Sequence, residues 1–352
     1  MLHKRALLAV FLGFLLLPAL GVDNAIGAAA GSSKGMTTVV RSARRAALGL
    51  VNPRAVFRDT MYSTGGTGLR NQSKGSILLN GNGTPPPAAV AAYAYWAVIT
   101  NGPAVPGMHD RLFIRKIDPA VTKFVELVGE VVGTGPDPCW PGDTITVFKA
   151  PVPLAIINAS TVPGGSHAGV FTVAIKCKSA SSCLGEDPWA VGLPAPLWEG
   201  AAIVAIWPAS GRVTSLYDVG ISGTLFFGTP GITYDLTLPL PTDGGFVLWD
   251  NHGYDGQVGS GRPAIPGVGD EKTTISGIDV AGPGTAYNDS DWNGSDSKPL
   301  PQLSDTSGHL LTPESGLAAL PVTIVSPTGG ASDCLTLGFN LVNQGIPAAL
   351  RR

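Results

Sequence analysis

The sequence predicts an all-β fold, an antiparallel β-sandwich or a jelly-roll-like arrangement, built as one large sandwich or as two packed ones. Helix-forming residues are scarce, with six Glu, ten Lys and four Met among 352 residues. Gly (47) and Pro (30) are abundant but follow no triplet period, which indicates many turns and excludes collagen. Runs of Thr, Val, Ile and aromatic residues are interrupted by turn residues about every 10 positions, a spacing typical of a sandwich or barrel.

Residues 1–30 predict a secretory signal peptide. A basic start, His3 to Arg5, precedes an apolar block over residues 6–20, and small residues follow at 28–30. The apolar block is shorter than the ~20 residues that span a bilayer, so we expect cleavage, with an uncleaved anchor as the alternative. The sequence therefore predicts a secreted protein, extracellular or at the cell surface, whose mature chain has no transmembrane segment.

Three further parts are expected after the signal peptide. Residues 31–58 are basic and rich in small side chains, which is typical of a linker or N-terminal arm. Residues 59–190 are predicted to form a first β-sandwich part, and residues 191–345 a second part with acidic loops. The Pro- and Trp-rich stretch at 187–198 is either a boundary between two sandwiches or a long crossover within one fold.

Strands are predicted where runs of apolar and β-branched residues lie between turn residues. The continuous apolar run at 201–207 is typical of a strand at the centre of a sheet. In the run at 124–132, the even spacing of Glu126 and Glu130 places both on one face, which we expect to be the solvent face. The predicted strands are 76–79, 91–100, 112–117, 124–132, 144–149, 152–158, 169–177, 201–207, 212–219, 224–227, 232–238, 246–249, 273–278, 322–325 and 335–342.

Four cysteines, Cys139, Cys177, Cys183 and Cys334, follow the predicted signal peptide. An even number in an exported chain indicates two disulfides, with free thiols or a metal site as the alternatives. Cys177 and Cys183 flank a short polar loop that a disulfide would close easily, which leaves Cys139 to pair with Cys334. Zinc has little support, because no CxxC pair and no His at ligand spacing is present.

Six short phrases occur in order along the chain. They are GTGLRN (66–71), AAYAYWA (91–97), GPDPCW (135–140), LWEGAAIV (197–204), NGSD (293–296) and DCL (333–335). Their order resembles that of the strands and loops in a loose group of exported bacterial β-sandwich proteins of unknown function. The resemblance covers about residues 58–342 and is only partial at 303–309. It implies a secreted sandwich and no particular activity, since none is established for the group.

The candidate metal ligands are Asp289, Asp291, Asn293 and Asp296. Oxygen ligands at the first, third and fifth positions, followed by a glycine, match the opening of a calcium-binding loop. The glutamate that ends such a loop is replaced by Leu300, so a distant Asp would have to complete the site. Calcium is therefore the candidate cofactor, and a plain turn is the alternative, because Asp, Asn, Ser and Gly are ordinary turn residues.

The candidate ligand-binding residues are Trp249, Asn251, Tyr254 and Gln257. Aromatic rings that stack on a sugar, beside amides that hydrogen-bond its hydroxyls, would make a carbohydrate-binding face. The alternative is a connection between strands whose tryptophan packs into the core, where large aromatic residues are usually buried.

The sequence favours a non-catalytic protein over an enzyme, and no catalytic residue is predicted. The formal net charge of −2 gives no field that would attract nucleic acid, and no P-loop or basic-aromatic face is present. No assembled nucleophile or acid–base pair is recognisable. We therefore expect an exported or surface-associated β-sandwich protein that binds carbohydrate or a cell-envelope component. The alternatives are a secreted polysaccharide-active enzyme of jelly-roll type and a structural envelope or matrix protein.

Overall fold

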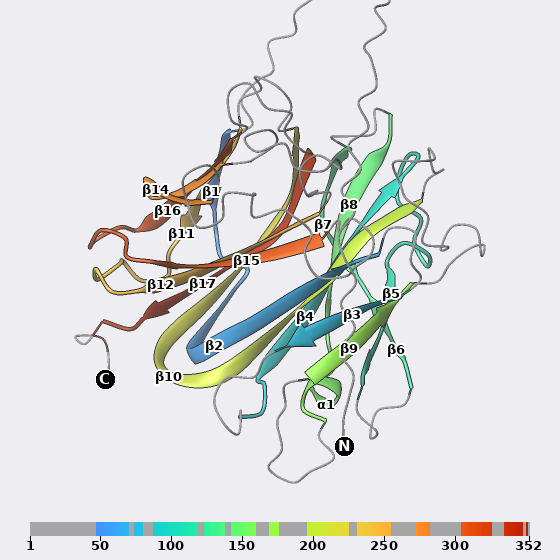
Figure 1. Ribbon diagram of the computed structural model, residues 1–352, viewed down its shortest axis with the longest axis horizontal. Helices are drawn as coiled ribbons and strands as arrows, with labels where there is room; N and C mark the ends of the chain where they lie inside the picture. Colours follow the sequence, from blue (N-terminus) through green and yellow to red (C-terminus); the bar gives the residue numbers. More distant parts are fainter. Residues whose placement is uncertain are drawn as a thin grey trace, which may run out of the picture. The chain divides into compact units, whose positions relative to one another are not determined.

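Runs of β-branched and aromatic residues form strands throughout the part of the chain that the computed structural model describes (Figure 1). The strands make three sheets, in which all neighbouring strands but one pair are antiparallel. The predicted all-β sandwich fold is therefore confirmed. The described residues are 47–69, 74–79, 87–117, 123–137, 142–159, 169–175, 196–224, 231–254, 272–281, 304–325, 334–347 and 350.

The central sheet has eight strands, and the long strand β10 joins its two halves. One strand, β2 (Ala55–Gly68), pairs with β10 outside the linear order of the sheet. The remaining strands, in hydrogen-bonded order, are β15 (Ser304–Leu311), β12 (Val247–Tyr254), β17 (Cys334–Gly345), β10 (Leu197–Thr224), β4 (Ala91–Thr100), β8 (Thr144–Pro151) and β7 (Glu130–Pro136).

A sharp bend divides β10 into a proximal half (197–208) and a distal half (212–224), and Figure 1 shows the strand turning back at its lower end. The proximal half pairs with β4 and the distal half with β17, while β2 follows β10 around the bend. Gly211 (φ 75°) and Asp59 (φ 53°) have left-handed backbones at this corner. The Asp59 carboxylate accepts a hydrogen bond of 2.8 Å from the Gly211 amide, so the two strands bend together.

A four-stranded sheet packs against the proximal half of the central sheet. Trp96 of β4 and Trp207 of β10 are fully buried in this interface together with Phe171 of the smaller sheet. Large aromatic side chains of this kind supply most of the apolar area that such a core buries. The strands of the smaller sheet are β3 (Lys74–Leu79), β9 (Gly169–Ala174), β5 (Arg111–Lys116) and β6 (Val125–Val128).

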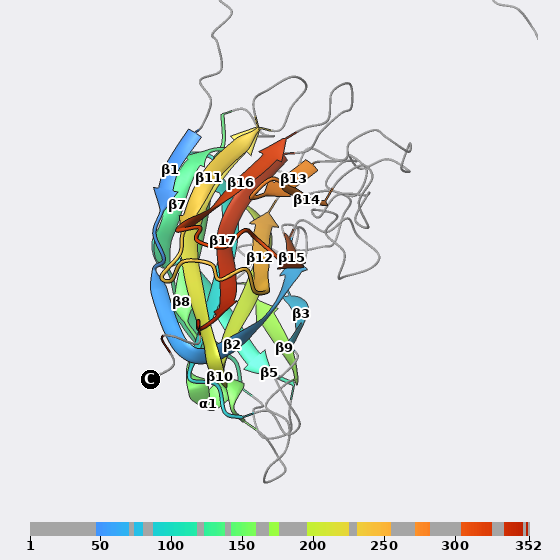
Figure 2. The same ribbon diagram turned by 90° about the vertical axis from the view of Figure 1, so that its left-hand side faces the viewer.

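A five-stranded sheet packs against the distal half. Tyr217 of β10, Trp249 of β12 and Tyr234 of the five-stranded sheet are fully buried in the shared core. The strands of this sheet are β1 (Ala47–Val51), β11 (Ile232–Thr237), β16 (Ala319–Val325), β13 (Lys272–Ile275) and β14 (Ile278–Ala281), and Figure 2 shows β1, β11 and β16 side by side.

A third core lies between the two halves of the bent central sheet. Tyr95 of β4 contacts Phe339 of β17, with ring centroids 4.4 Å apart, and Tyr62 of β2 is buried beside them. Strands from both predicted sandwich parts contribute to this core, and residues 43–352 form one compact unit. The strand β10 therefore belongs to both sandwiches, and the predicted boundary at residue 190 stays a prediction.

The predicted linker and one predicted strand differ in the structure. The expected linker, 31–58, ends in ordered strands, since β1 pairs in parallel with β11 and β2 begins at Ala55. The strand expected at 152–158 is instead the short helix α1 (Leu154–Ile157). Pro153 precedes this helix with φ −55°, a backbone angle that suits entry into a helix. Within the described ranges, no helix has the length and apolar character needed to cross a bilayer.

The single strand expected at 124–132 is also wrong, because the chain passes from one sheet to another at Gly129. β6 belongs to the four-stranded sheet and β7 to the central sheet. A Cβ atom at Gly129 would lie 2.6 Å from the Trp96 ring, so only glycine lets the chain pass this close to the core. Glu126 and Glu130 therefore do not share a sheet face, although both side chains are exposed.

Candidate functional site

The predicted ligand-binding residues Trp249, Asn251 and Tyr254 lie on β12, and their side chains are fully buried. The Trp249 indole donates to Asn340 Oδ1 at 2.8 Å, and the Asn340 amide donates to Asn251 Oδ1 at 3.1 Å. These two hydrogen bonds hold β12 against β17. Gln257 lies outside the described residues, so ligand binding by the four together stays a prediction.

Asp250, between two of these residues, is a buried carboxyl that joins the two halves of the central sheet. It accepts a short hydrogen bond from the Tyr62 hydroxyl of β2. Burial raises the pKa of Asp250 to about 6, although the bond from Tyr62 and the charge of His309 oppose that shift.

The variant Asp250→Asn is expected to remove part of the pH dependence of stability. Folding raises the pKa of Asp250 from 3.8 to about 6, so the protonated carboxyl stabilises the folded protein. This stabilisation is complete below pH 3.8. It is lost as the pH rises through the higher value, a change on the order of 2–3 kcal/mol. Urea unfolding of both proteins at several pH values should show the stability difference shifting in favour of the variant as pH rises. A difference that does not change with pH would contradict this.

The other predicted site residues fall largely outside the described ranges. The side chain of Cys334, the first residue of β17, is not described, and the disulfide prediction stays untested. Within the described ranges, no three His, Cys, Asp or Glu side chains converge as metal ligands would. The predicted residues that lie outside are Asp289, Asp291, Asn293, Asp296, Cys139, Cys177 and Cys183.

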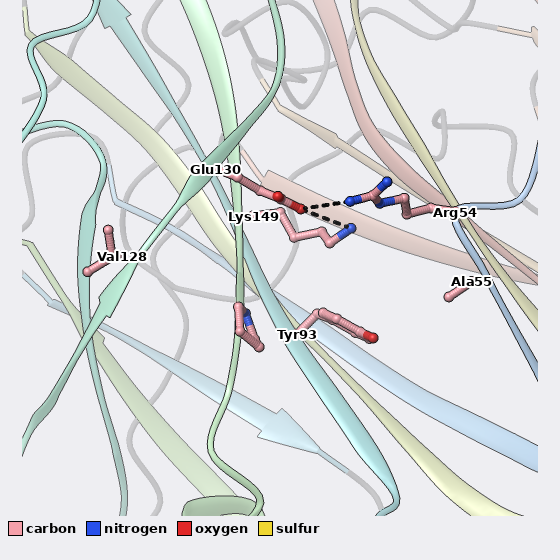
Figure 3. Close-up of a pocket in the computed structure, with 7 residues that line it drawn as sticks. Arg54, Ala55, Tyr93, Val128, Glu130 and Lys149 are labelled. Atoms are coloured by element: carbon pink, nitrogen blue, oxygen red, sulfur yellow. Dashed lines mark ion pairs between the residues drawn. The ribbon is translucent and has the colours of Figure 1, made fainter.

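A surface pocket of about 350 Å³ lies where β4, β7 and β8 meet the start of β2. We call it the Tyr93 pocket (Figure 3). Charged side chains and apolar side chains line it, together with one tyrosine. The lining residues are Arg54, Ala55, Tyr93, Val128, Glu130, Lys149 and Pro151.

Strand register builds this pocket. Lys149 of β8 is the cross-strand partner of Tyr95 on one side and of Glu130 on the other. Tyr93 lies two residues from Tyr95 and therefore on the same face of β4, opposite Pro151. A row of residues that are distant in sequence thus comes together across three adjacent strands.

Four charged groups form a linked cluster at the pocket. Lys149 Nζ lies 2.7 Å from Asp218 Oδ2 of β10 and 3.7 Å from Glu130 Oε1. The Arg54 guanidinium lies 3.6 Å from Glu130 and 3.8 Å from Asp218. Figure 3 shows the Glu130 carboxylate directed toward both cations. Because Asp218 comes from the distal half of β10, the cluster also ties together the two halves of the bent sheet.

Two tyrosines complete the environment of Lys149. Its ammonium lies 5.3 Å from the centroid of the Tyr93 ring and 5.8 Å from that of Tyr95, within the range of cation–π attraction. The Tyr95 hydroxyl donates to Asp218 Oδ1 at 2.6 Å. Burial, followed by the negative charge of Asp218, raises the pKa of both tyrosines. Both hydroxyls are therefore neutral hydrogen-bond donors near neutral pH.

None of these pocket residues was predicted as a binding residue from the sequence. Two signals were present: the alternation of tyrosines in AYAYW, and a lysine that is the one charged residue of strand β8. Neither signal identifies its partners, because the register between strands is set only when the sheet forms.

Comparisons with known proteins add no functional assignment. No family model and no curated protein matches the sequence. A solved chain described as recombinant N-glycanase F (PNGase F) is 9% identical with a TM-score of 0.23, over 82% of this chain and 96% of that one. A chain from the crystal structure of plant peptide RALF23 in complex with FER and LLG2 is 9% identical with a TM-score of 0.24, over 84% and 94%. At TM-scores this low, neither similarity supports an inference about the fold or the function of this chain.

Proposed function

We propose that this protein is an exported, non-catalytic β-sandwich protein that binds a carbohydrate or another cell-envelope component in the Tyr93 pocket. Export is supported by the leader-like residues 1–30 and by the resemblance to exported sandwich proteins. Binding is supported by the pocket itself, which combines an aromatic ring, apolar walls and exposed charged groups. Its volume falls within the range of small-molecule sites, about 300–1,000 Å³.

The observation that carries the proposal is the position of Tyr93 beside Arg54 and Glu130. An aromatic ring offers a flat apolar surface to the C–H face of a sugar, while a guanidinium and a carboxylate can hydrogen-bond hydroxyl groups. Among the described residues, no hydrogen bond engages the Tyr93 hydroxyl, so it is free to contact a ligand. Calcium held by Asp289, Asp291, Asn293 and Asp296 would stiffen the acidic loops.

The pocket gives less support to a polysaccharide-active enzyme. Such an enzyme needs two carboxyl groups free to act on the bond between two sugars. At the Tyr93 pocket, both Glu130 and Asp218 contact the same lysine ammonium and the same guanidinium. Both carboxylates therefore lie against cations, unlike the two unpaired carboxyl groups that such an enzyme needs.

The variant Tyr93→Ala is expected to weaken glycan binding by roughly ten-fold or more, because the loss of one stacking ring costs about 1.4 kcal/mol. The secreted protein and the variant would be applied to a glycan array with and without calcium, and affinities for the bound glycans measured by calorimetry.

Phe246→Ala is the matched control, because Phe246 is an exposed aromatic residue that does not line the pocket. It should bind like the unmodified protein. Equal loss of binding in both variants, or no binding to any glycan or envelope fraction by the unmodified protein, would contradict the proposed function.

A further inference from the structure

The charges at the Tyr93 pocket are balanced. Arg54 and Lys149 provide two positive charges, and Glu130 and Asp218 provide two negative ones, with every cation within 3.8 Å of both carboxylates. An anionic ligand would be repelled by two carboxylates, and a cationic ligand by the lysine and the arginine. Neither charge type gains a net attraction.

The lysine is not available to pair with an anion. Its side chain is only 5% exposed, and it donates a 2.7 Å hydrogen bond to Asp218. Its burial leaves a ligand carboxylate or phosphate little access to the ammonium, and drawing the ammonium away from Asp218, a largely buried charge, would be costly. Lys149 therefore acts as a structural cation.

The two other groups keep hydrogen-bonding capacity that faces solvent. The side chains of Arg54 and Glu130 are 60% and 58% exposed, and their separation of 3.6 Å is longer than a good hydrogen bond. A guanidinium offers only donors and a carboxylate only acceptors, so the two lie side by side as a donor–acceptor pair. Adjacent hydroxyls on a sugar ring both donate and accept, and can satisfy the two groups together.

The remaining walls are apolar. Ala55, Val128 and Pro151 line the pocket with the Tyr93 ring, and Val128 is 54% exposed. Such surfaces match the C–H faces of a pyranose ring. They are unfavourable for a ligand that carries several charged groups, because those groups would lose their hydration.

We infer that the Tyr93 pocket selects a neutral sugar ring with adjacent hydroxyls, and discriminates against acidic and amino sugars. The inference rests on the proposed function and names the ligand class for the same site. Neutral selection arises because Lys149, Asp218, Arg54 and Glu130 cancel one another while two of them remain exposed to bond hydroxyls.

Ligand-observed NMR titrations test this inference with six probes: the methyl glycosides of glucose, galactose and mannose, the methyl glycosides of glucuronate and galacturonate, and glucosamine. We expect at least one neutral glycoside to bind, with an affinity that changes by less than roughly two-fold between low and high salt. The variant Glu130→Gln removes one negative charge. It is expected to raise the affinity for the acidic glycosides, relative to that for the neutral ones, by roughly five-fold.

Glu126→Gln is the matched control, because Glu126 is an exposed glutamate that pairs with Arg111 within the four-stranded sheet and does not line the pocket. It should leave the ratio unchanged. Tighter, salt-sensitive binding of the acidic glycosides by the unmodified protein would overturn neutral selection while leaving the proposed function intact. If none of the six probes binds, the inference is overturned, and the proposed function falls as well only if the glycan array is also blank.

Discussion

Replacing Lys149 with Met is expected to destabilise the protein by roughly 3 kcal/mol, because the change leaves Asp218 without its closest cation. The effect should lie at the low end of the range for breaking a buried pair, since Arg54 remains 3.8 Å from the same carboxylate. Urea unfolding followed by tryptophan fluorescence measures it.

A second substitution separates lost charge pairing from lost packing. In the double variant Lys149→Met/Asp218→Asn the unpaired charge is gone, and the Asn side chain can still accept the hydrogen bond from Tyr95. Much of the lost stability should return. Arg111→Met is the control for a more exposed ion pair and should cost less than about 1 kcal/mol. A double variant as unstable as the single one would show that Lys149 stabilises through packing instead.

The variant Gly133→Ala is expected to destabilise the protein by about 3 kcal/mol, because β7 and the distal half of β10 touch there through their backbones. A Cβ atom at Gly133 would lie 1.9 Å from the carbonyl oxygen of Gly220, and backbone on both sides leaves little room to adjust. To relieve this clash, β7 would have to move away from the distal half of β10. That movement would separate Glu130 from Asp218, so sugar binding should weaken as well.

Gly345→Ala serves as the control for the loss of a glycine in a strand. A Cβ atom there meets nothing within 4 Å, and the backbone is not left-handed. Its stability should stay within about 1 kcal/mol of the unmodified protein or improve slightly. Equal stability of the two variants would mean that the approach of β7 to β10 is looser than the structure shows.

The ion pair of Lys149 with Asp218 and the close approach of Gly133 to Gly220 explain the position of the pocket. The bend in β10 brings its distal half back toward β7, and the close approach at Gly133 and Gly220 sets the distance between the two halves. Asp218, two residues before Gly220, then reaches Lys149 across the third core. The Tyr93 pocket is thus a consequence of the bend in one long strand.

Local sequence was sufficient for much of the secondary structure. The strand predicted at 91–100 matches β4 in full, because an uninterrupted run of apolar and aromatic residues there is suited to a buried strand. The run at 232–238 likewise contains β11, in which buried and less buried residues alternate. The continuity of β10 through the bend at Gly211 was missed, since the sequence predicted two separate strands, at 201–207 and 212–219.

The candidate site shows the opposite case. Trp249 and Asn251 were chosen because an aromatic residue beside amides is typical of sugar sites, but the pairing of β12 with β17 places both in the interior. Tyr93, Glu130 and Lys149 carry no local motif, and their association depends on which strands pair and in which register.

The sequence by itself determined that this chain folds as layered sheets, because turn residues at short intervals leave its apolar runs no other way to be buried. It also determined the leader-like start and the candidate calcium and disulfide residues, which remain predictions. Only the tertiary structure decided which polar residues meet at the surface. The physical reason is that strand pairing joins residues far apart in the chain, and shifting the register by one residue would reverse every side chain.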